Sequence, residues 1–202
     1  MTTNNPQDYL AANAVVDSDH PTVVAKAKAL ALDLHNDLKI AQKCFEYVRD
    51  EIDHSGDVPA VITTYKASEV LEHKTGWCYA KSHLLAALLR ANKIPAGLCY
   101  QRLSQGESGP PYSLHGLNAV YLKDFGWYRI DPRGNKPKVD AQFTPPQEQL
   151  AFVIQDENEG DFETIYEAPL TEVAQALQCN SDYKTMVQNL PDRVLYEKER
   201  RR

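Results

Sequence analysis

The chain has no apolar run long enough to cross a membrane. None of its 202 residues falls in a hydrophobic stretch that approaches the ~18 residues of a transmembrane helix. The first seven residues also lack a basic segment followed by an apolar one, so we expect no signal peptide. These two absences predict a cytoplasmic protein that has no membrane partner.

Closely spaced cysteines are missing as well. The four cysteines are far apart in the chain, and none forms a Cys-x-x-Cys pair: Cys44, Cys78, Cys99 and Cys179. The sequence contains neither a His-Glu-x-x-His motif nor a glycine-rich phosphate loop. We therefore predict free thiols in a reducing compartment, no metal site and no cofactor. Cys44 lies on the apolar stripe of a predicted helix, and Cys99 lies among apolar neighbours in a predicted strand, so we expect both to be core residues.

The chain also lacks an excess of positive charge. It has 28 acidic and 22 basic residues, which gives a formal net charge of −6. This balance argues against nucleic acid as the main partner. The basic end, residues 198–202, is a local exception that we interpret as a solvated tail. A hydrophobic content of 43% at this length fits one globular domain.

The hydrophobic pattern predicts helices in the first half of the chain and strands in the middle. Apolar residues recur at helical spacing in several segments, which predicts helices over residues 21–34, 37–52, 67–71, 78–91 and 171–178. Runs of β-forming residues predict strands over residues 97–103, 114–122 and 127–131.

Two groups of polar side chains are expected to face solvent. In the helix predicted over residues 78–91, Lys81 and Arg90 should lie on the exposed face. Four histidines have polar or terminal surroundings and should be exposed, namely His20, His35, His54 and His73. His83 falls on a different helical face from Cys78, which makes a shared metal site improbable.

The segment Gly76-Trp77-Cys78-Tyr79 is the most informative motif in the chain. It opens an apolar run that is typical of a helix, so Cys78 lies in the first helical turn. Unpaired backbone N–H groups and the positive end of the helix dipole favour thiolate over thiol at that position. The motif therefore predicts a nucleophilic cysteine.

Two later residues can complete the chemistry of a cysteine nucleophile. Reaction of a thiol with an amide needs a histidine that keeps the sulfur charged and later protonates the leaving amine, and a group that orients the imidazole ring. His115 and Asp131 lie in the two predicted strands that follow the helix. We predict that Cys78, His115 and Asp131 act as nucleophile, acid and base, and orienting carboxylate.

The reaction also needs donors for the oxyanion. The backbone N–H of Cys78 is one natural donor. The sequence leaves the second donor open among the side chains of Trp77, Tyr65 and Tyr79, of which Trp77 and Tyr79 flank the nucleophile and are the predicted substrate-binding residues.

The hairpin between the two strands sets a geometric condition on this assignment. Side chains alternate along a strand with a period of two residues. His115 and Asp131 can therefore share one face only if the connecting loop has an odd number of residues or a bulge shifts the register. Gly126 can adopt the left-handed conformation that ends a three-residue hairpin loop, so the required geometry is accessible.

Several of these segments together resemble the bacterial branch of the transglutaminase-like superfamily. They are residues 68–71 with 76–78, residues 84–96, and residues 126–132, in which Asp131 comes sixteen residues after His115. The resemblance spans about residues 36–135. Two positions depart from the usual pattern: Leu117 stands where an aromatic residue is usual, and Trp77 stands where aspartate is frequent.

The resemblance implies an α+β fold of the papain/transglutaminase-like type. In that fold the N-terminal half is helical, and the nucleophile begins a central helix that packs on an antiparallel sheet. It implies one domain with its core at residues 36–135, an N-terminal helical extension at 1–35 and a C-terminal extension at 136–202. It also implies that Cys78, His115 and Asp131 match the catalytic triad of the superfamily.

The expected function is that of a cysteine-dependent amide hydrolase or acyltransferase that works through a thioester. The expected substrate is a peptide, a protein or a small amide. Water as acceptor makes the chain a peptidase or amidase, and an amine makes it a transamidase. We favour hydrolysis slightly, because the chain shows no sign of the extra domains or calcium sites of the large animal crosslinking enzymes. The alternative is a peptide- or protein-binding module that keeps the fold without turnover.

Overall fold

The structure is a computed structural model that describes residues 5–59, 61–180 and 182–196. The predicted basic tail at residues 198–202 lies outside these residues. Among the described residues, no helix combines the length and the apolar character that crossing a membrane requires. All four cysteines are free thiols, and Cys44, Cys78 and Cys99 are buried.

The helices and strands follow the predicted order, with additional short elements. The helices are η1 (Pro6–Leu10), α1 (Pro21–Leu30), α2 (Asp37–Glu51), α3 (Ala67–His73), α4 (Cys78–Ala91), α5 (Thr171–Gln178) and α6 (Tyr183–Gln188). The strands are β1 (Asp53–His54), β2 (Thr75–Gly76), β3 (Ala96–Ser104), β4 (Tyr112–Leu122), β5 (Gly126–Ile130), β6 (Gln142–Thr144), β7 (Gln147–Gln149) and β8 (Gly160–Asp161). Helix α1 is shorter than predicted, because the chain turns after Leu30 and Asp33 has a φ of 61°.

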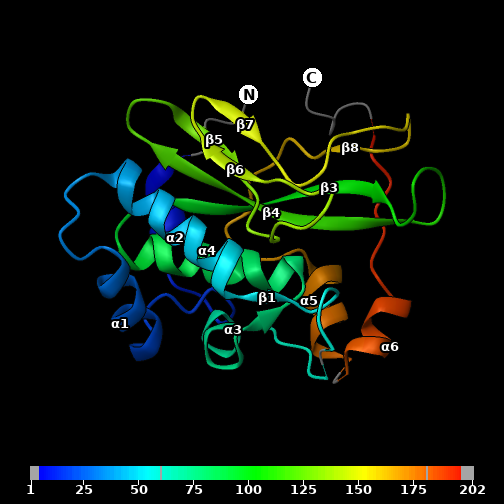
Figure 1. The fold of residues 1–202 in the computed structure, drawn as a ribbon, viewed down its shortest axis with the longest axis horizontal. Helices are drawn as coiled ribbons and strands as arrows, with labels where there is room; N and C mark the ends of the chain where they lie inside the picture. Colours follow the sequence, from blue (N-terminus) through cyan, green and yellow to red (C-terminus); the bar gives the residue numbers. More distant parts are fainter. Residues whose placement is uncertain (1–4, 60, 181, 197–202) are drawn as a thin grey trace.

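A four-stranded antiparallel sheet and a layer of helices form the body of the molecule. The strand order is β5-β4-β3-β8. Helix α4 packs against β3 and β4, and helices α1, α2 and α3 pack against α4 (Figure 1). This arrangement confirms the predicted α+β fold, with a central helix that begins at Cys78 and packs on an antiparallel sheet.

Helix α4 is enclosed on all sides, and this overturns the expected exposure of two of its residues. Every residue from Cys78 to Arg90 is buried, so Lys81 and Arg90 are not on a solvent face. Arg90 donates to three backbone carbonyls, those of Ala96, Ala11 and Glu167, at 2.8 to 2.9 Å.

Lys81 is fully buried and also relies on backbone carbonyls. Its ammonium donates to the carbonyls of Ile52 and, at 3.4 Å, Arg49. Burial, together with the charge of Arg133, lowers the pKa of Lys81 to about 7. Periodicity alone placed both cations in water because it presumes that one helical face is solvated, and α4 has no such face.

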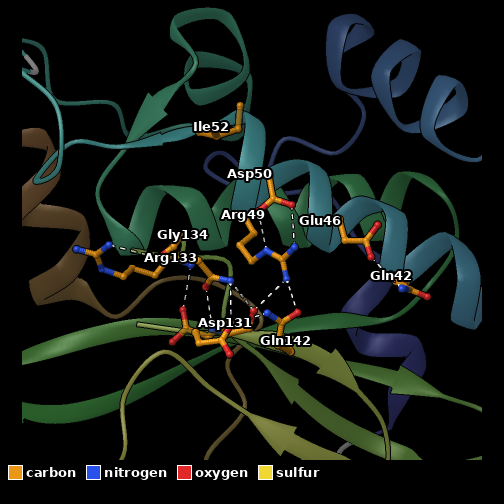
Figure 2. A network of polar contacts seen from close by, with 12 residues as sticks. Gln42, Glu46, Arg49, Asp50, Ile52, Asp131, Arg133, Gly134 and Gln142 are labelled. Carbon is orange, nitrogen blue, oxygen red and sulfur yellow. Dashed lines mark hydrogen bonds and ion pairs between the residues drawn. The ribbon is translucent and has the colours of Figure 1, made fainter. Parts of the chain in front are cut away.

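The end of α2 is fastened to the segment that follows the hairpin (Figure 2). The Arg49 guanidinium donates to both oxygens of Asp50 at 2.7 and 2.8 Å. It also donates to the Ala141 carbonyl and the Gln142 side chain at 3.0 Å each. This junction fixes the start of β1, which pairs in parallel with β2 and thereby brings His54 opposite Gly76.

The β4–β5 hairpin meets the condition derived from the sequence. Leu122 pairs with Gly126, so three residues, 123–125, form the loop, and Gly126 has a φ of 73°. The register pairs Asn118 with Ile130. Continued by one residue, it places Asp131 opposite Leu117, and His115 projects from the same face as Leu117. The odd-numbered loop therefore puts His115 and Asp131 on one side of the hairpin, as predicted.

Candidate active site

Cys78 is the first residue of α4, and its sulfur lies against strand β4. The preceding Trp77 is the N-cap residue and makes no side-chain capping hydrogen bond. The backbone N–H of Gly116 donates to the Cys78 sulfur at 3.5 Å. The thiol is therefore next to both the positive end of a helix and an N–H donor, and both features favour a sulfur that carries negative charge.

Gly116 allows the strand and the helix to approach this closely. A Cβ atom at this position would lie 2.8 Å from Tyr79 Cδ1 and 3.0 Å from Tyr79 Cα. Those distances are shorter than ordinary van der Waals contact, and one of them is to backbone. The glycine that follows His115 is therefore required for the contact between β4 and the first turn of α4.

His115 and Asp131 form a buried pair. His115 Nε2 lies 2.7 Å from Asp131 Oδ2. The Asp131 carboxylate also accepts backbone N–H groups from Arg133 and Ala151, each at 3.1 Å. Burial raises the pKa of Asp131, but the charge of His115 and these hydrogen bonds lower it below its ordinary value overall. Asp131 is therefore ionised and accepts the proton of Nε2.

The second nitrogen of His115 is available to the thiol. Because Nε2 donates to Asp131, Nδ1 is the ring nitrogen that remains to interact with Cys78, whose proximity helps to raise the His115 pKa. Burial alone would lower that pKa. The charges and hydrogen bonds of Asp131 and Cys78 outweigh burial and raise it to about 10. The arrangement favours a protonated imidazole beside the Cys78 sulfur at neutral pH.

Phe152 covers the imidazole ring from the side. Its ring meets that of His115 edge to face, with the centroids 4.9 Å apart and the planes at 89°. The neighbouring Ala151 supplies an N–H to Asp131. Sequence reasoning missed these two residues, although the apolar run at residues 150–154 was a signal that part of the predicted C-terminal extension packs on the core, as Ala151 and Phe152 do.

The three residues meet at a cavity of about 340 Å³. Cys78 and His115 both line it, and Asp131 lies behind His115. Most of the wall is apolar and comes from separate parts of the chain: Trp77, Leu103, Leu114, Phe152, Val187 and Leu190. The cavity can therefore accommodate the aliphatic or aromatic parts of a substrate close to the thiol.

His54 lies in the wall of the cavity, contrary to the expectation that it is exposed. It is 6% exposed, and its ring packs on that of Trp77 with the centroids 4.6 Å apart. Its Nδ1 accepts the N–H of Gly56 at 3.1 Å. Burial and the charge of Arg133 lower the pKa of His54 well below its ordinary value, so the ring is neutral. His20, His35 and His73 are exposed as expected.

Arg133 links the carboxylate of the site to the other wall of the cavity. Its backbone N–H donates to Asp131, and its guanidinium forms a two-point ion pair with Asp57. Lys136 donates to the same Asp57 carboxylate at 2.7 Å. Asp57 follows His54 in the same turn, so one ionic contact ties the segment after β5 to the segment after β1.

The three side chains considered as oxyanion donors have different surroundings in the structure. Trp77 lines the cavity, and its indole N–H is buried without a hydrogen-bond partner among the described residues. Tyr79 is 1% exposed and its hydroxyl donates to the Leu114 carbonyl. Tyr79 therefore lies behind the site and not at its surface. Tyr65 lines a different hollow, next to Asn13 and Val15.

No group of three or more His, Cys, Asp or Glu side chains within the described ranges is arranged to bind a metal ion. His83 accordingly has another role. It is fully buried, and its Nδ1 lies 2.8 Å from the Tyr65 carbonyl.

Comparison with known protein families matches residues 24–132, more than half of the chain, to the transglutaminase-like superfamily. No curated protein matches the chain. One similar solved structure is a candidate cysteine protease from Cytophaga hutchinsonii, with 18% identity, a TM-score of 0.51, and coverage of 64% of this chain and 42% of that one. Another is the periplasmic domain of TgpA from Pseudomonas aeruginosa, with 19% identity, a TM-score of 0.48, and coverage of 64% and 48%. The chain thus spans less than half the length of both.

Proposed function

Because this chain belongs to the transglutaminase-like superfamily, we propose that it is a cysteine-dependent amide hydrolase or acyltransferase with Cys78, His115 and Asp131 as its catalytic triad. One observation carries the proposal. His115 is bonded through Nε2 to the buried, ionised Asp131, and its ring lies close enough to Cys78 for the sulfur to raise its pKa, at the wall of an apolar cavity. A purely structural cysteine does not need a charged histidine beside it.

The geometry supports a reaction in two steps. The Cys78 thiolate attacks the carbonyl carbon of the amide, and a tetrahedral oxyanion forms. His115 Nδ1 gives its proton to the leaving nitrogen, the carbon–nitrogen bond breaks, and a thioester on Cys78 remains. An acceptor then gives a proton to Nδ1 and attacks the thioester, which releases the sulfur as thiolate. Asp131 stabilises the imidazolium at each stage.

Two donors suit the oxyanion. As the first residue of α4, Cys78 has a backbone N–H that no intrahelical carbonyl accepts. Trp77 lines the cavity, and its indole N–H is buried with no hydrogen-bond partner among the described residues, so pairing with a developing oxyanion would offset that cost. The Tyr79 hydroxyl is already bonded to Leu114, so we assign the second donor to Trp77 instead of Tyr79.

We propose water as the main acceptor and a peptide, protein or small amide as the substrate. The apolar wall suits the side chains of a peptide. Part of that wall comes from residues 152–159 and 187–190, which lie outside the domain core proposed for residues 36–135. If an amine instead of water attacks the same thioester, the product is a new amide and the reaction is a transamidation.

Trapping of the acyl-enzyme tests this function. The intact chain is mixed with a pool of peptides and glutamine-containing amide donors, and its mass is measured. We expect an acyl adduct on the unmodified chain and on Cys179→Ala, the matched control at an exposed thiol, and none on Cys78→Ala. An adduct that persists in Cys78→Ala would contradict the assignment.

Alkylation gives an independent measure of the thiolate. At pH 6, iodoacetamide should modify Cys78 faster than the exposed Cys179, although Cys78 is only 3% exposed, because only the thiolate reacts. Equal or slower modification of Cys78, together with peptide binding and no adduct, would favour the binding-module alternative.

A further inference from the structure

The cavity extends away from the thiol along strand β3. Gln101 pairs with His115 across the β3–β4 ladder, and Ser104 comes three residues later on β3. At the rise of a strand, Ser104 is about 10 Å along β3 from the level of His115. Ser104 and Glu159 both line the cavity at this distal end.

Glu159 is a buried carboxylate without a counter-ion. It is 7% exposed, and its two oxygens accept the N–H groups of Ser104 and Gln155, each at 2.8 Å. Burial raises its pKa, but these hydrogen bonds lower it below the ordinary value overall, so Glu159 is ionised. None of the cationic side chains in the described part of the chain forms an ion pair with it.

The hydroxyl of Ser104 lies beside this carboxylate. Its oxygen is buried and makes no well-formed hydrogen bond within the described segments, and it lies close enough to Glu159 to help lower the pKa of that carboxyl. A buried polar atom without a partner is costly and uncommon. Glu107, on the neighbouring loop, also lines this end and adds negative charge.

The opposite end of the cavity has a different charge balance. Arg133 lines that end, and its guanidinium is neutralised by Asp57. The cation at one end is therefore already paired, whereas the carboxylate at the other end is not. The apolar wall between Cys78 and Glu159 includes Leu103 and Leu114, which suits an aliphatic chain.

We infer that the Ser104–Glu159 end is a subsite for a primary ammonium group of the substrate. The carboxylate of Glu159 and the oxygen of Ser104 accept two of its protons. Each Glu159 oxygen already accepts a backbone N–H, so the two-point fork of a guanidinium fits less well than a compact ammonium. An extended peptide covers about 10 Å in three residues, so the ammonium belongs about three residues from the amide that reacts. This inference rests on the proposed function, which places the reacting amide at Cys78.

Binding of peptides to the Cys78→Ala chain tests the subsite without turnover. The probes are nonapeptides of alanine and glycine with a central glutamine, an acetylated amino terminus and a fluorescein at the carboxyl end. Each carries one lysine, moved through the other positions, and is matched to a peptide with norleucine in its place. Shorter peptides with a free or acetylated amino terminus three residues from the glutamine distinguish a terminal ammonium from a lysine ammonium.

We expect lysine to bind about tenfold more tightly than norleucine at the position about three residues from the glutamine. In Glu159→Gln this preference should fall below twofold, and in Ser104→Ala it should weaken while the carboxylate remains. Glu157→Gln, which removes the same charge from an exposed side chain in the same turn, should keep the full preference.

Equal binding of lysine and norleucine peptides at every position would overturn the inference. A lysine preference that survives in Glu159→Gln would overturn the role of Glu159. Because norleucine peptides report binding without the charge, their unchanged affinity shows that a variant is folded. Acyl-enzyme formation is measured separately on the unmodified chain. If the adduct forms but no lysine preference is found, only the subsite is contradicted. If the lysine preference is found but no adduct forms, only the catalytic proposal is contradicted.

Discussion

Helix α4 and strand β4 each bury a histidine, and the groups beside the two rings differ in charge. His83 on α4 is fully buried, and its Nδ1 lies next to the neutral Tyr65 carbonyl. Burial lowers its pKa to about 4. His115 on β4 is buried nearly as well, but it meets the Asp131 carboxylate, and its pKa rises to about 10.

The comparison shows that burial by itself makes an imidazole neutral. A buried carboxylate in direct contact reverses that effect and keeps the ring charged. One histidine is therefore suited to packing, and the other is suited to moving a proton at a sulfur. The following changes test this difference, beginning with the largest expected effect.

Asp131→Asn should remove the difference between the two histidines. Without the carboxylate charge the pKa of His115 should fall from about 10, and alkylation of Cys78 at pH 6 should slow by about 10²-fold, because a thiol with the ordinary pKa of about 8.5 is less than about 1% ionised at that pH. Proton NMR titration of the imidazole and iodoacetamide kinetics measure the two effects. Asp124→Asn, at an exposed residue of the hairpin loop, is the control. An unchanged titration of His115 would show that Asp131 does not determine its charge.

Gly116→Ala should disturb the approach of His115 to Cys78 without changing any ionisable group. The added Cβ would lie 2.8 Å from the Tyr79 ring, so β4 must shift. We expect a loss of about 2 kcal/mol in the free energy of unfolding and about 10²-fold slower acyl-enzyme formation. Gly106→Ala meets nothing within 4 Å and should change neither quantity. Equal effects of the two substitutions would argue against a close-packed contact at Gly116.

Asp57→Asn should weaken the link between Arg133 and the His54 wall. Loss of the ion pair leaves the buried guanidinium with a weaker partner, and we expect a cost of about 2 kcal/mol in the free energy of unfolding at pH 7. Burial raises the Asp57 pKa, but the Arg133 and Lys136 hydrogen bonds lower it overall. Its stabilisation is therefore present above about pH 4 and is lost as the pH falls further.

Urea unfolding at pH 3 and pH 7 measures this effect. The gap between Asp57→Asn and the unmodified chain should be smaller at pH 3. The control is Asp50→Asn, which breaks the more exposed Arg49–Asp50 pair and should cost less than about 1 kcal/mol. A gap for Asp57→Asn that is the same at both pH values would contradict the assignment.

His83→Leu should affect stability and leave the chemistry unchanged. The folded pKa of about 4 lies below the ordinary value, so the unfolded chain binds the extra proton between about pH 6.5 and pH 4. Stability from His83 is therefore lost as the pH falls through that range, by about 1.4 kcal/mol per pH unit. In urea unfolding, the free energy of unfolding of the variant should depend less steeply on pH. Its rate of Cys78 alkylation should stay within about twofold of that of the unmodified chain. A large fall in that rate would mean that the two histidines are coupled.

Much of the fold and the order of the site residues could be predicted from the sequence. Periodicity placed Cys78 at the beginning of a helix because α4 has a regular apolar core and its N-terminal boundary is marked by Gly76 and Trp77. A shared face for His115 and Asp131 could be predicted as accessible, because an odd-numbered loop gives both side chains the same face and Gly126 can end a three-residue loop.

The remainder depended on contacts between distant segments. Nothing in the local pattern around Lys81 or Arg90 shows that α4 is covered by helices on one side and by the sheet on the other. His54 is next to Trp77 because β1 pairs with β2, two strands of two residues each that are too short to have a pattern. Glu159 is joined to β3 by the N–H of Ser104, a contact between residues far apart in the sequence.

The loop at residues 123–125 and strand β5 constrain the length of this hairpin differently. Directly paired residues share a face of the sheet, so a residue added to the loop leaves β4 and β5 paired as before and keeps Asp131 opposite Leu117. A residue added within β5 instead moves Asp131 by one place and turns its carboxylate to the other face. The surface loop should therefore tolerate changes in length that the five residues of β5 do not.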